Sequence, residues 1–306
     1  MKTMRAVTVI CWIITAIALA GIAVWFLTGT IFGFTSTRWE GWSFMRNAGG
    51  FESLTGPYNV VGSESVNATG INSIRIDWVA GEITVIPHDG SEFLVTESAQ
   101  RELRNNETFY VTTSGDTLMI KYTERTISGR TPQKRLEVLV PRELSKNMHM
   151  LSIDTVSGEA NVTDITAAIL KTESISGRLD LSGVFGDVKV KTVSGGATLK
   201  NSAQNAVLDA DTVSGRLELS GYFDKAVINS VSGGISFTSA IVPASIKADS
   251  ISGSITIALP ADAEISVNHS SVSGRLSSDI PVTMEGRGAV INISTVSGST
   301  KITTLD

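Results

Sequence analysis

The residues of this chain that could do chemistry are repeated serines, three histidines and scattered acids. From residue 155 onward, a four-residue pattern, Ser or Thr, then Val or Ile, then Ser-Gly, occurs eight times. Its glycines are Gly158, Gly177, Gly195, Gly215, Gly233, Gly253, Gly274 and Gly298. A serine nucleophile of the hydrolase type stands in a Gly-x-Ser-x-Gly turn, a sequence that this chain lacks. The repeated serines therefore predict a structural turn, in which the hydroxyl bonds to nearby backbone.

The three histidines do not form a metal-binding or catalytic pattern. His88, His149 and His269 are far apart in the chain, and none has the His-Glu-x-x-His spacing of a zinc enzyme. His269 falls in a column of otherwise apolar repeat positions, so we expect a hydrogen-bonded structural residue there. We predict no catalytic, cofactor-binding or metal-binding residues.

Acids recur four residues before the repeat glycines. The residues at this position are Asp154, Glu173, Lys191, Asp211, Asn229, Asp249, Ser270 and Ser294. A calcium site needs several oxygen ligands at close range, and Lys191 interrupts the series. We therefore expect a solvated face here and no calcium ladder.

Enzymes that hydrolyse glycosidic bonds use a pair of carboxylic acids that flank the bond. Asp209 and Asp211 lie on one face of one expected strand, while Asp187, Asp224 and Asp249 fall on other repeats. This scatter favours a protein without catalysis, and a carbohydrate-active solenoid enzyme is the alternative.

A charged residue follows the glycine in half of the repeats. These residues are Glu159, Arg178, Arg216 and Arg275, and they stand among small residues. The functional interpretation is a stripe for an anionic polymer. Because exposed charge is the ordinary state of a protein surface, we favour a solvated edge.

The residues around each glycine alternate between apolar and polar, which is typical of β-strands. Apolar side chains dominate the positions two and four residues after the glycine and five and seven before it. We predict an all-β fold, a β-solenoid or two-sheet stack with rungs of about 19 residues. In the motif we expect Val or Ile to point inward, Ser to tie the turn and Gly to let the chain bend.

The part before the regular repeats also predicts strands. Residues 93–96, 108–112, 118–122 and 136–140 read as strands, and Ser114-Gly115-Asp116 suggests a hairpin. The predicted organisation is a tip (1–5), a membrane helix (6–34), a juxtamembrane linker (35–70), an irregular β region (71–150) and the regular repeats (151–306).

Residues 6–34 contain no charged residue, and this length exceeds the roughly 20 residues that a membrane-spanning helix needs. Lys2 and Arg5 precede the run and favour a cytoplasmic N-terminus, which places the repeats outside the membrane. The partner of this segment is the lipid bilayer. The alternative is a signal peptide cleaved near Ala18-Leu19-Ala20.

The net charge and the cysteine content exclude one class of partner and one kind of covalent link. The net charge is −5, so no basic field draws the chain to nucleic acid. Cys11 is the single cysteine, so the repeats contain no internal disulfide.

At its repeats the chain resembles the bacterial putative-adhesin family of β-strand-repeat proteins, which is built around a domain of unknown function. The serial Thr-Val-Ser-Gly turns carry the resemblance, together with strands ending in Leu139-Val140-Pro141 and Ala258-Leu259-Pro260 and the N-terminal membrane segment. It covers residues 71–306. The resemblance implies a surface module of the cell envelope, and it transfers no catalytic or ligand-binding residue.

The predicted protein is therefore a single-pass cell-membrane protein that presents a surface-exposed β-repeat module for adhesion, scaffolding or cell-envelope sensing, without a cofactor. Its expected partner beyond the bilayer is an envelope polymer or an envelope or membrane protein. Besides the enzyme, a self-assembling structural rod is the other alternative. Against the rod, the polar residues Thr300, Lys301, Thr303 and Thr304 predict a C-terminal cap that blocks stacking.

Overall fold

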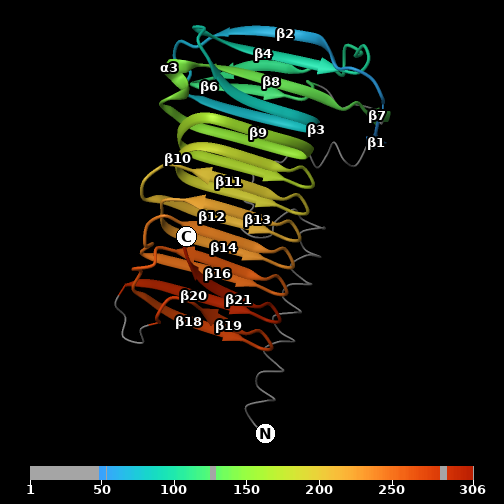
Figure 1. Ribbon diagram of the computed structural model, residues 1–306. Coiled ribbons are helices and arrows are strands. Elements are labelled where there is room, and N and C mark those ends of the chain that lie inside the picture. The colour runs from blue at the N-terminus through green and yellow to red at the C-terminus, as the bar shows by residue number, and fades with distance from the viewer. Residues whose placement is uncertain (1–47, 53, 125–128, 283–287, 306) are drawn as a thin grey trace.

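The computed structural model describes residues 48–52, 54–124, 129–282 and 288–305. The predicted tip (1–5) and membrane helix (6–34) lie outside these residues. Among the described residues, no helix is long and apolar enough to cross a bilayer. Strands are the dominant element of the described chain, which contains one short helix (Figure 1), so the all-β fold class is confirmed.

The chain winds into a stack of rungs, each contributing one strand before its corner glycine and one after it (Figure 1). We call the two resulting layers the pre-glycine sheet and the post-glycine sheet. Three long strands bend at a corner or connection and serve both sheets: β3 (Ser73–His88), β9 (Met148–Ser174) and β10 (Leu179–Thr192). The later strands of the pre-glycine sheet are β12 (Ala206–Thr212), β14 (Phe223–Ser230), β16 (Ser245–Ser250), β18 (Ile265–Ser271) and β20 (Ala289–Thr295). Those of the post-glycine sheet are β11 (Ala197–Asn201), β13 (Leu217–Gly221), β15 (Ile235–Ser239), β17 (Ile255–Leu259), β19 (Leu276–Ser278) and β21 (Thr300–Thr304).

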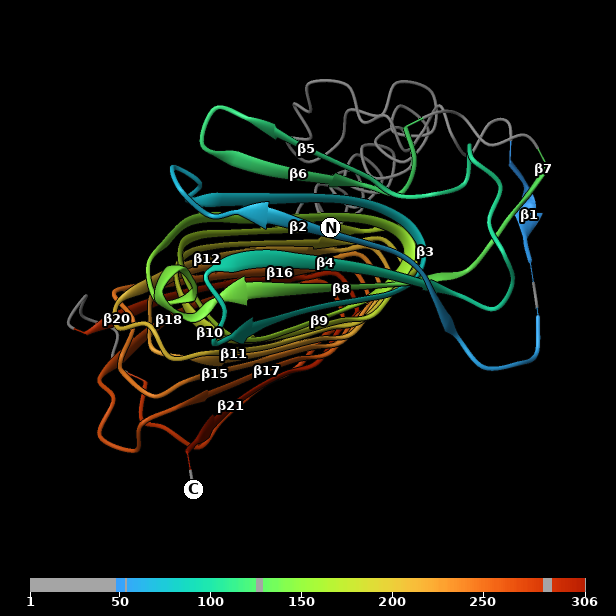
Figure 2. The same ribbon diagram turned by 90° about the horizontal axis from the view of Figure 1, so that it is seen from above.

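Neighbouring rungs pair in parallel and in register, so equivalent repeat positions form straight columns. Ala197 of β11, for example, lies beside Leu179 of β10 on one side and Leu217 of β13 on the other. Seen along the stack, β12 and β16 fall in one layer and β11, β15 and β17 in the other (Figure 2). This register places the apolar alternation of every repeat on the inner side of both sheets.

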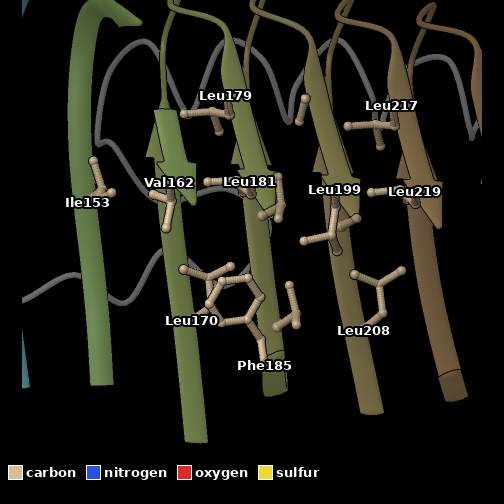
Figure 3. Close-up of a cluster of buried hydrophobic side chains, with 14 of the residues drawn as sticks. Ile153, Val162, Leu170, Leu179, Leu181, Phe185, Leu199, Leu208, Leu217 and Leu219 are labelled. Carbon is tan, nitrogen blue, oxygen red and sulfur yellow. The ribbon is translucent and has the colours of Figure 1, made fainter. Parts of the chain in front are cut away.

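The core is the space between the two sheets. Side chains such as Val162, Leu181 and Leu199 from successive rungs stack on one another and meet Leu170 and Leu208 from the facing sheet (Figure 3). All five are at most 2% exposed. Burying a side chain of this size contributes about 1.5–3 kcal/mol, so these columns are the main source of stability.

Antiparallel strands close the first end of the stack, and we call them the N-terminal cap. The pre-glycine half of β3 pairs with β6 (Thr117–Lys121), which forms a hairpin with β5 (Tyr110–Ser114), as the sequence predicts. The post-glycine half pairs with β8 (Lys134–Pro141), followed by β4 (Glu92–Ala99) and β2 (Asn59–Asn67). A one-turn helix, α3 (Arg142–Ser145), connects β8 to β9.

The linker expected over residues 35–70 contains two strands in its described part. β1 (Ala48–Phe51) pairs with β7 (Gly129–Thr131), and β2 pairs with β4 over its whole length. No side chain of β2 is buried. The strand therefore lacks the apolar alternation by which a strand is recognised in a sequence.

The last two rungs are stacked in the reverse of their sequence order. β16 pairs with β20 and β20 pairs with β18, while β17 pairs with β21 and β21 pairs with β19 (Figure 1). The inward residues explain this order, because Ile293 and Ile302 are buried in the inner rung, whereas His269 and Ser278 occupy the same columns of the outer rung. The C-terminal cap expected at Thr300–Thr304 is therefore wrong, since the end rung is β18–β19.

Candidate functional site

The motif serines are bound to backbone in every repeat. Ser176 Oγ donates to the carbonyl of Val156 at 3.2 Å, and Ser194 Oγ donates to the carbonyl of Ile175 at 3.1 Å. Each acceptor lies in the adjoining rung. The same bond recurs at Ser157, Ser214, Ser232, Ser252, Ser273 and Ser297. The prediction that these serines are structural is thus supported by a specific role, which is to join one corner to the next.

The first residue of the motif points inward. The expectation that Val or Ile does so is confirmed in the first repeat, where Val156 is 3% exposed and belongs to the core, and is wrong at the end rung. Ser174 is buried and its Oγ donates to the carbonyl of Gly177 at 2.9 Å. Thr212 Oγ1 is likewise buried and accepts the Gly215 N–H at 2.9 Å. The Val or Ile beside it lies at the outer bend, where Val272 is 50% exposed. A small hydroxyl fits inside because it satisfies corner backbone groups that a branched alkyl group would leave unpaired.

The corner glycines are required by close approach of the backbone. A Cβ on Gly177 would lie 1.9 Å from the carbonyl oxygen of Gly158, and one on Gly215 would lie 1.9 Å from that of Gly195. Such separations are far inside van der Waals contact. The glycine column is therefore a packing requirement of the stack.

The acidic column of the pre-glycine sheet is a ladder of ion pairs that is partly buried. Arg75 contacts Asp77 at 3.0 Å and Asp154 at 3.1 Å. Lys191 contacts Asp211 at 3.6 Å, with side chains 2% and 14% exposed. The expectation of a solvated face is wrong for these members.

Burial changes the acidity of this column. It raises the pKa of Asp154 to about 7, and the carboxylates of Asp77 and Glu173 add to the shift. The pKa of Glu173 and that of Asp211 are also raised, in each case chiefly by burial. Among the described residues, no group of three or more acids or histidines could hold a metal ion. Two cations contact acids of this column, Arg75 at Asp77 and Asp154 and Lys191 at Asp211.

Three of the five acids considered for glycoside hydrolysis contact lysines. Asp209 contacts Lys189 at 3.2 Å, and Asp249 contacts Lys247 at 3.3 Å. Asp187 lies in β10 beside Val207 of β12, and Asp224 lies in β14. This arrangement differs from two carboxylic acids flanking one bond.

The histidines lie on separate elements, β3, β9 and β18. His88 Nε2 lies 2.8 Å from the carbonyl of Glu92, and His149 is exposed. His269 lies in the end rung, and its Nε2 is buried without a hydrogen-bond partner in the described structure, so the expected hydrogen bond is not formed by that atom.

The charges that follow the corner glycine are exposed. Arg178 and Arg216 are separated by Gly196 of the rung between them, and Arg275 lies on the end rung. Glu159 is also exposed. This edge is solvated, as expected, and its arginines do not occupy successive rungs.

A buried charge cluster in the N-terminal cap was missed by the sequence analysis. Lys134 Nζ contacts Glu97 Oε1 at 2.5 Å, and both side chains are fully buried. The ammonium also donates to the carbonyls of Glu107 at 2.7 Å and Tyr122 at 2.5 Å, and it lies 3.7 Å from the centre of the Tyr122 ring. With these contacts the charge is bonded on several sides, so its role is to hold the cap together.

Burial dominates the acidity of this cluster too. It lowers the pKa of Lys134 to about 8, against the opposing effect of Glu97. It raises the pKa of Glu97, against the effect of Lys134. Lys134 lies beside Gly81 in the corner register. The sequence does contain a signal for this position. If Leu136 and Val138 are aligned with the apolar positions two and four residues after the glycine, Lys134 falls at the glycine position.

Comparison with known proteins supports the fold. The family model of Toastrack DUF4097 matches residues 71–303. A putative adhesin from Bacteroides fragilis NCTC 9343 has a TM-score of 0.51 and 16% identity, covering 79% of this chain and 96% of that one. A protein from Parabacteroides distasonis ATCC 8503, named a putative lipid binding protein, has a TM-score of 0.52 and 14% identity, covering 80% and 96%. No curated protein matches significantly. The family model spans more than half of the sequence, and the chain belongs to the Toastrack DUF4097 family.

Proposed function

We propose that this protein is a non-catalytic binding module of the bacterial cell envelope. Residues 6–34 anchor it in the membrane, and the two-sheet stack is displayed outside the cell for adhesion, scaffolding or envelope sensing. The observation that carries the proposal is the register of the rungs, which repeats each outward side chain at roughly 4.8 Å intervals along two lateral faces. A surface that repeats in this way suits an extended partner.

The post-glycine face is the better candidate for contact with that partner. Two neighbouring rungs carry short hydroxyl side chains, with Ser236 of β15 beside Thr256 of β17 and Thr238 two residues further along β15, and Glu218 and Lys301 flank them in the same column. Hydroxyl groups can both donate and accept hydrogen bonds. The pre-glycine face carries more ion pairs, with Lys189, Lys191 and Lys247 each contacting an aspartate. An envelope polymer or an envelope protein is the partner class that fits.

The topology can be tested with protease on intact cells. The full-length chain with a C-terminal tag should lose the tag when intact cells are treated, because the repeats lie outside. A cytoplasmic marker protein serves as the control. Protection on intact cells, followed by cleavage once the cells are opened, would contradict the proposed location.

The binding face can be tested with paired substitutions. Ser236→Arg with Thr256→Arg should abolish retention of the purified full-length protein by envelope polymers, since the long side chains cover two adjoining rungs. Val207→Arg with Val227→Arg, at exposed positions of the pre-glycine sheet, is the matched control. Equal retention of the two variants would contradict the proposal that the post-glycine face binds the polymer. Cleavage of a polymer by the purified protein would favour the carbohydrate-active enzyme.

A further inference from the structure

One strand of the cap, β2, and the preceding strand β1 come from outside the family-matched region. That region begins at residue 71, whereas β1 and β2 span residues 48–51 and 59–67. β2 forms an antiparallel ladder with β4, from Asn59 opposite Ala99 to Asn67 opposite Glu92. The membrane-proximal segment thus supplies the strand that covers the outer edge of β4.

Backbone pairing holds β2 in place together with a few side-chain contacts, in which Val66 packs against the core and Ser65 Oγ donates to the Glu92 carboxylate. All nine residues are exposed or half-buried, and Val60 is 66% exposed. At Gly62, opposite Glu97, a Cβ would lie 2.7 Å from the Phe109 ring, so a side chain there would displace the ring. A ladder of this kind gives affinity through the main chain and places few demands on sequence.

An arginine clamp fastens the segment that precedes β2. The Arg101 guanidinium contacts Glu52 twice, at 2.9 and 3.0 Å, and Glu107 twice, at 2.8 and 3.0 Å. Gln100 Nε2 donates to the carbonyl of Gly56 at 2.9 Å. Paired contacts between arginine and carboxylate are among the stronger polar contacts in proteins. The Glu52 half of the clamp belongs to the membrane-proximal chain, and the Arg101 and Glu107 half belongs to the cap.

We propose that the edge of β4 is a strand-acceptor site, that β2 fills it in cis, and that an extended peptide segment of a partner protein replaces β2 when the Glu52 clamp opens. The replacing segment runs antiparallel to β4 and carries glycine opposite Glu97, where Phe109 leaves no room for a side chain. Strand addition to a sheet edge is a general mode of peptide recognition. The site lies on the cap, so it is separate from the lateral faces proposed above.

Uptake of a peptide in trans tests this site. The probe is a fluorescent peptide with the sequence of residues 57–69, added to the full-length protein in detergent and followed by anisotropy. Glu52→Gln weakens the clamp, which raises the fraction of molecules with an open edge and tightens apparent binding in proportion. We expect roughly a tenfold gain over the native chain. Glu143→Gln breaks the exposed ion pair with Lys146 at 2.9 Å and should leave binding unchanged.

Two controls make the result decisive. A probe peptide with Gly62→Val should not bind, because its side chain meets Phe109. Ser63→Cys with Thr96→Cys, in a Cys11→Ser chain, places two thiols where hydroxyl oxygens lie 3.4 Å apart. Oxidation should then lock β2 onto β4 and abolish uptake, and reduction should restore it. Equal uptake by the oxidised and reduced chains, or no gain from Glu52→Gln, would overturn the proposal.

Discussion

At the scale of single residues, the most consequential side chain is Lys134. It stands at the corner position that glycine occupies in the regular rungs. Each later corner glycine has the carbonyl of a neighbouring glycine against it, as Gly177 has that of Gly158. Lys134 lies in the rung that begins the post-glycine stack, and its side chain reaches carbonyl groups of Glu107 and Tyr122. The lysine therefore satisfies backbone acceptors at the end of the stack.

Removing this lysine should be costly. Lys134→Met leaves the Glu97 carboxylate buried without its cation, and we expect a loss of about 3–5 kcal/mol in the free energy of unfolding. Adding Glu97→Gln removes the buried charge and keeps an acceptor for the Phe109 N–H, which lies 3.2 Å away. The double variant should recover roughly 2 kcal/mol. Chemical denaturation of the variants measures both values, and equal stability of single and double variants would contradict the assignment.

The same lysine predicts a rise of stability at alkaline pH. Its pKa is about 8 in the folded chain and has an ordinary value of 10.5. Between these values the unfolded chain binds a proton that the folded chain does not, so this group makes the protein more stable as pH rises. The raised pKa of Tyr122 acts in the opposite direction above its ordinary value of 10.0. Denaturation between pH 8 and 10 should therefore show a steeper rise for the native chain than for Lys134→Met/Glu97→Gln.

At the scale of the elements, the rung corner shows what a repeat motif can and cannot predict. The eight glycines and their spacing were sufficient to predict strands, corners and the all-β class. They were insufficient to predict which motif residue points inward. The hydrophobicity of Val favours the core, but the corner backbone needs hydroxyl partners, and Ser174 and Thr212 provide them. Hydrogen bonding of the turn outweighed side-chain hydrophobicity at this position.

Adjacent glycines of one corner give a matched test of close approach. A Cβ on Gly195 would lie 2.0 Å from the Gly177 carbonyl oxygen, whereas one on Gly196 would meet nothing closer than 3.3 Å. Gly195→Ala should therefore cost at least ~3 kcal/mol through backbone displacement. Gly196→Ala should change stability by less than ~1 kcal/mol. Thermal unfolding of the two variants measures these changes. Similar losses of stability in both variants would contradict the packing argument.

The reversed order of the last rungs can be tested by disulfide trapping. In a Cys11→Ser chain, Lys247→Cys with Asn292→Cys places the thiols on paired strands, because these residues are register partners. Lys247→Cys with Asn268→Cys separates them by two strand spacings, roughly 10 Å, which a disulfide cannot bridge. Gel mobility under mild oxidation should show a cross-link in the first variant alone. A cross-link in the second variant alone would show that β18 pairs with β16, so that the rungs stack in sequence order.

At the scale of the whole molecule, the regular middle of the stack was predictable, whereas at the two ends several strands were predictable but the order in which they stack was not. The repeat pattern predicts the surroundings of a residue that has an equivalent residue in the rung on each side. Leu199 in β11 is such a residue. At the ends one neighbour is missing, so local polarity and chain connections decide. The cap cluster of Lys134 and Glu97 and the inserted rung at Ile293 are both of this kind. The candidate lateral face followed from the repeat, whereas the strand-acceptor edge required the pairing of β2.

The polar end rung predicts that the protein does not form filaments. His269 and Ser278 occupy inward columns whose members in the next rung are Ile293 and Ile302. Polar inward residues are a known device for preventing edge-to-edge association. Replacing both, as His269→Ile with Ser278→Ile, should promote association at this end, measured by sedimentation of the full-length protein in detergent. Outward Asn268→Ile serves as the control, and a double variant that stays as monodisperse as the native chain would contradict the role of the end rung.

The inserted position of β20 and β21 has a consequence for the chain during its synthesis. Domains begin to fold from the N-terminal side during translation. β18 and β19 leave the ribosome first, yet in the described structure they join the stack through the later strands β20 and β21. The growing stack therefore keeps an open edge at β16 and β17 until β20 and β21 have been made. A product cut short before Ala289 retains that edge.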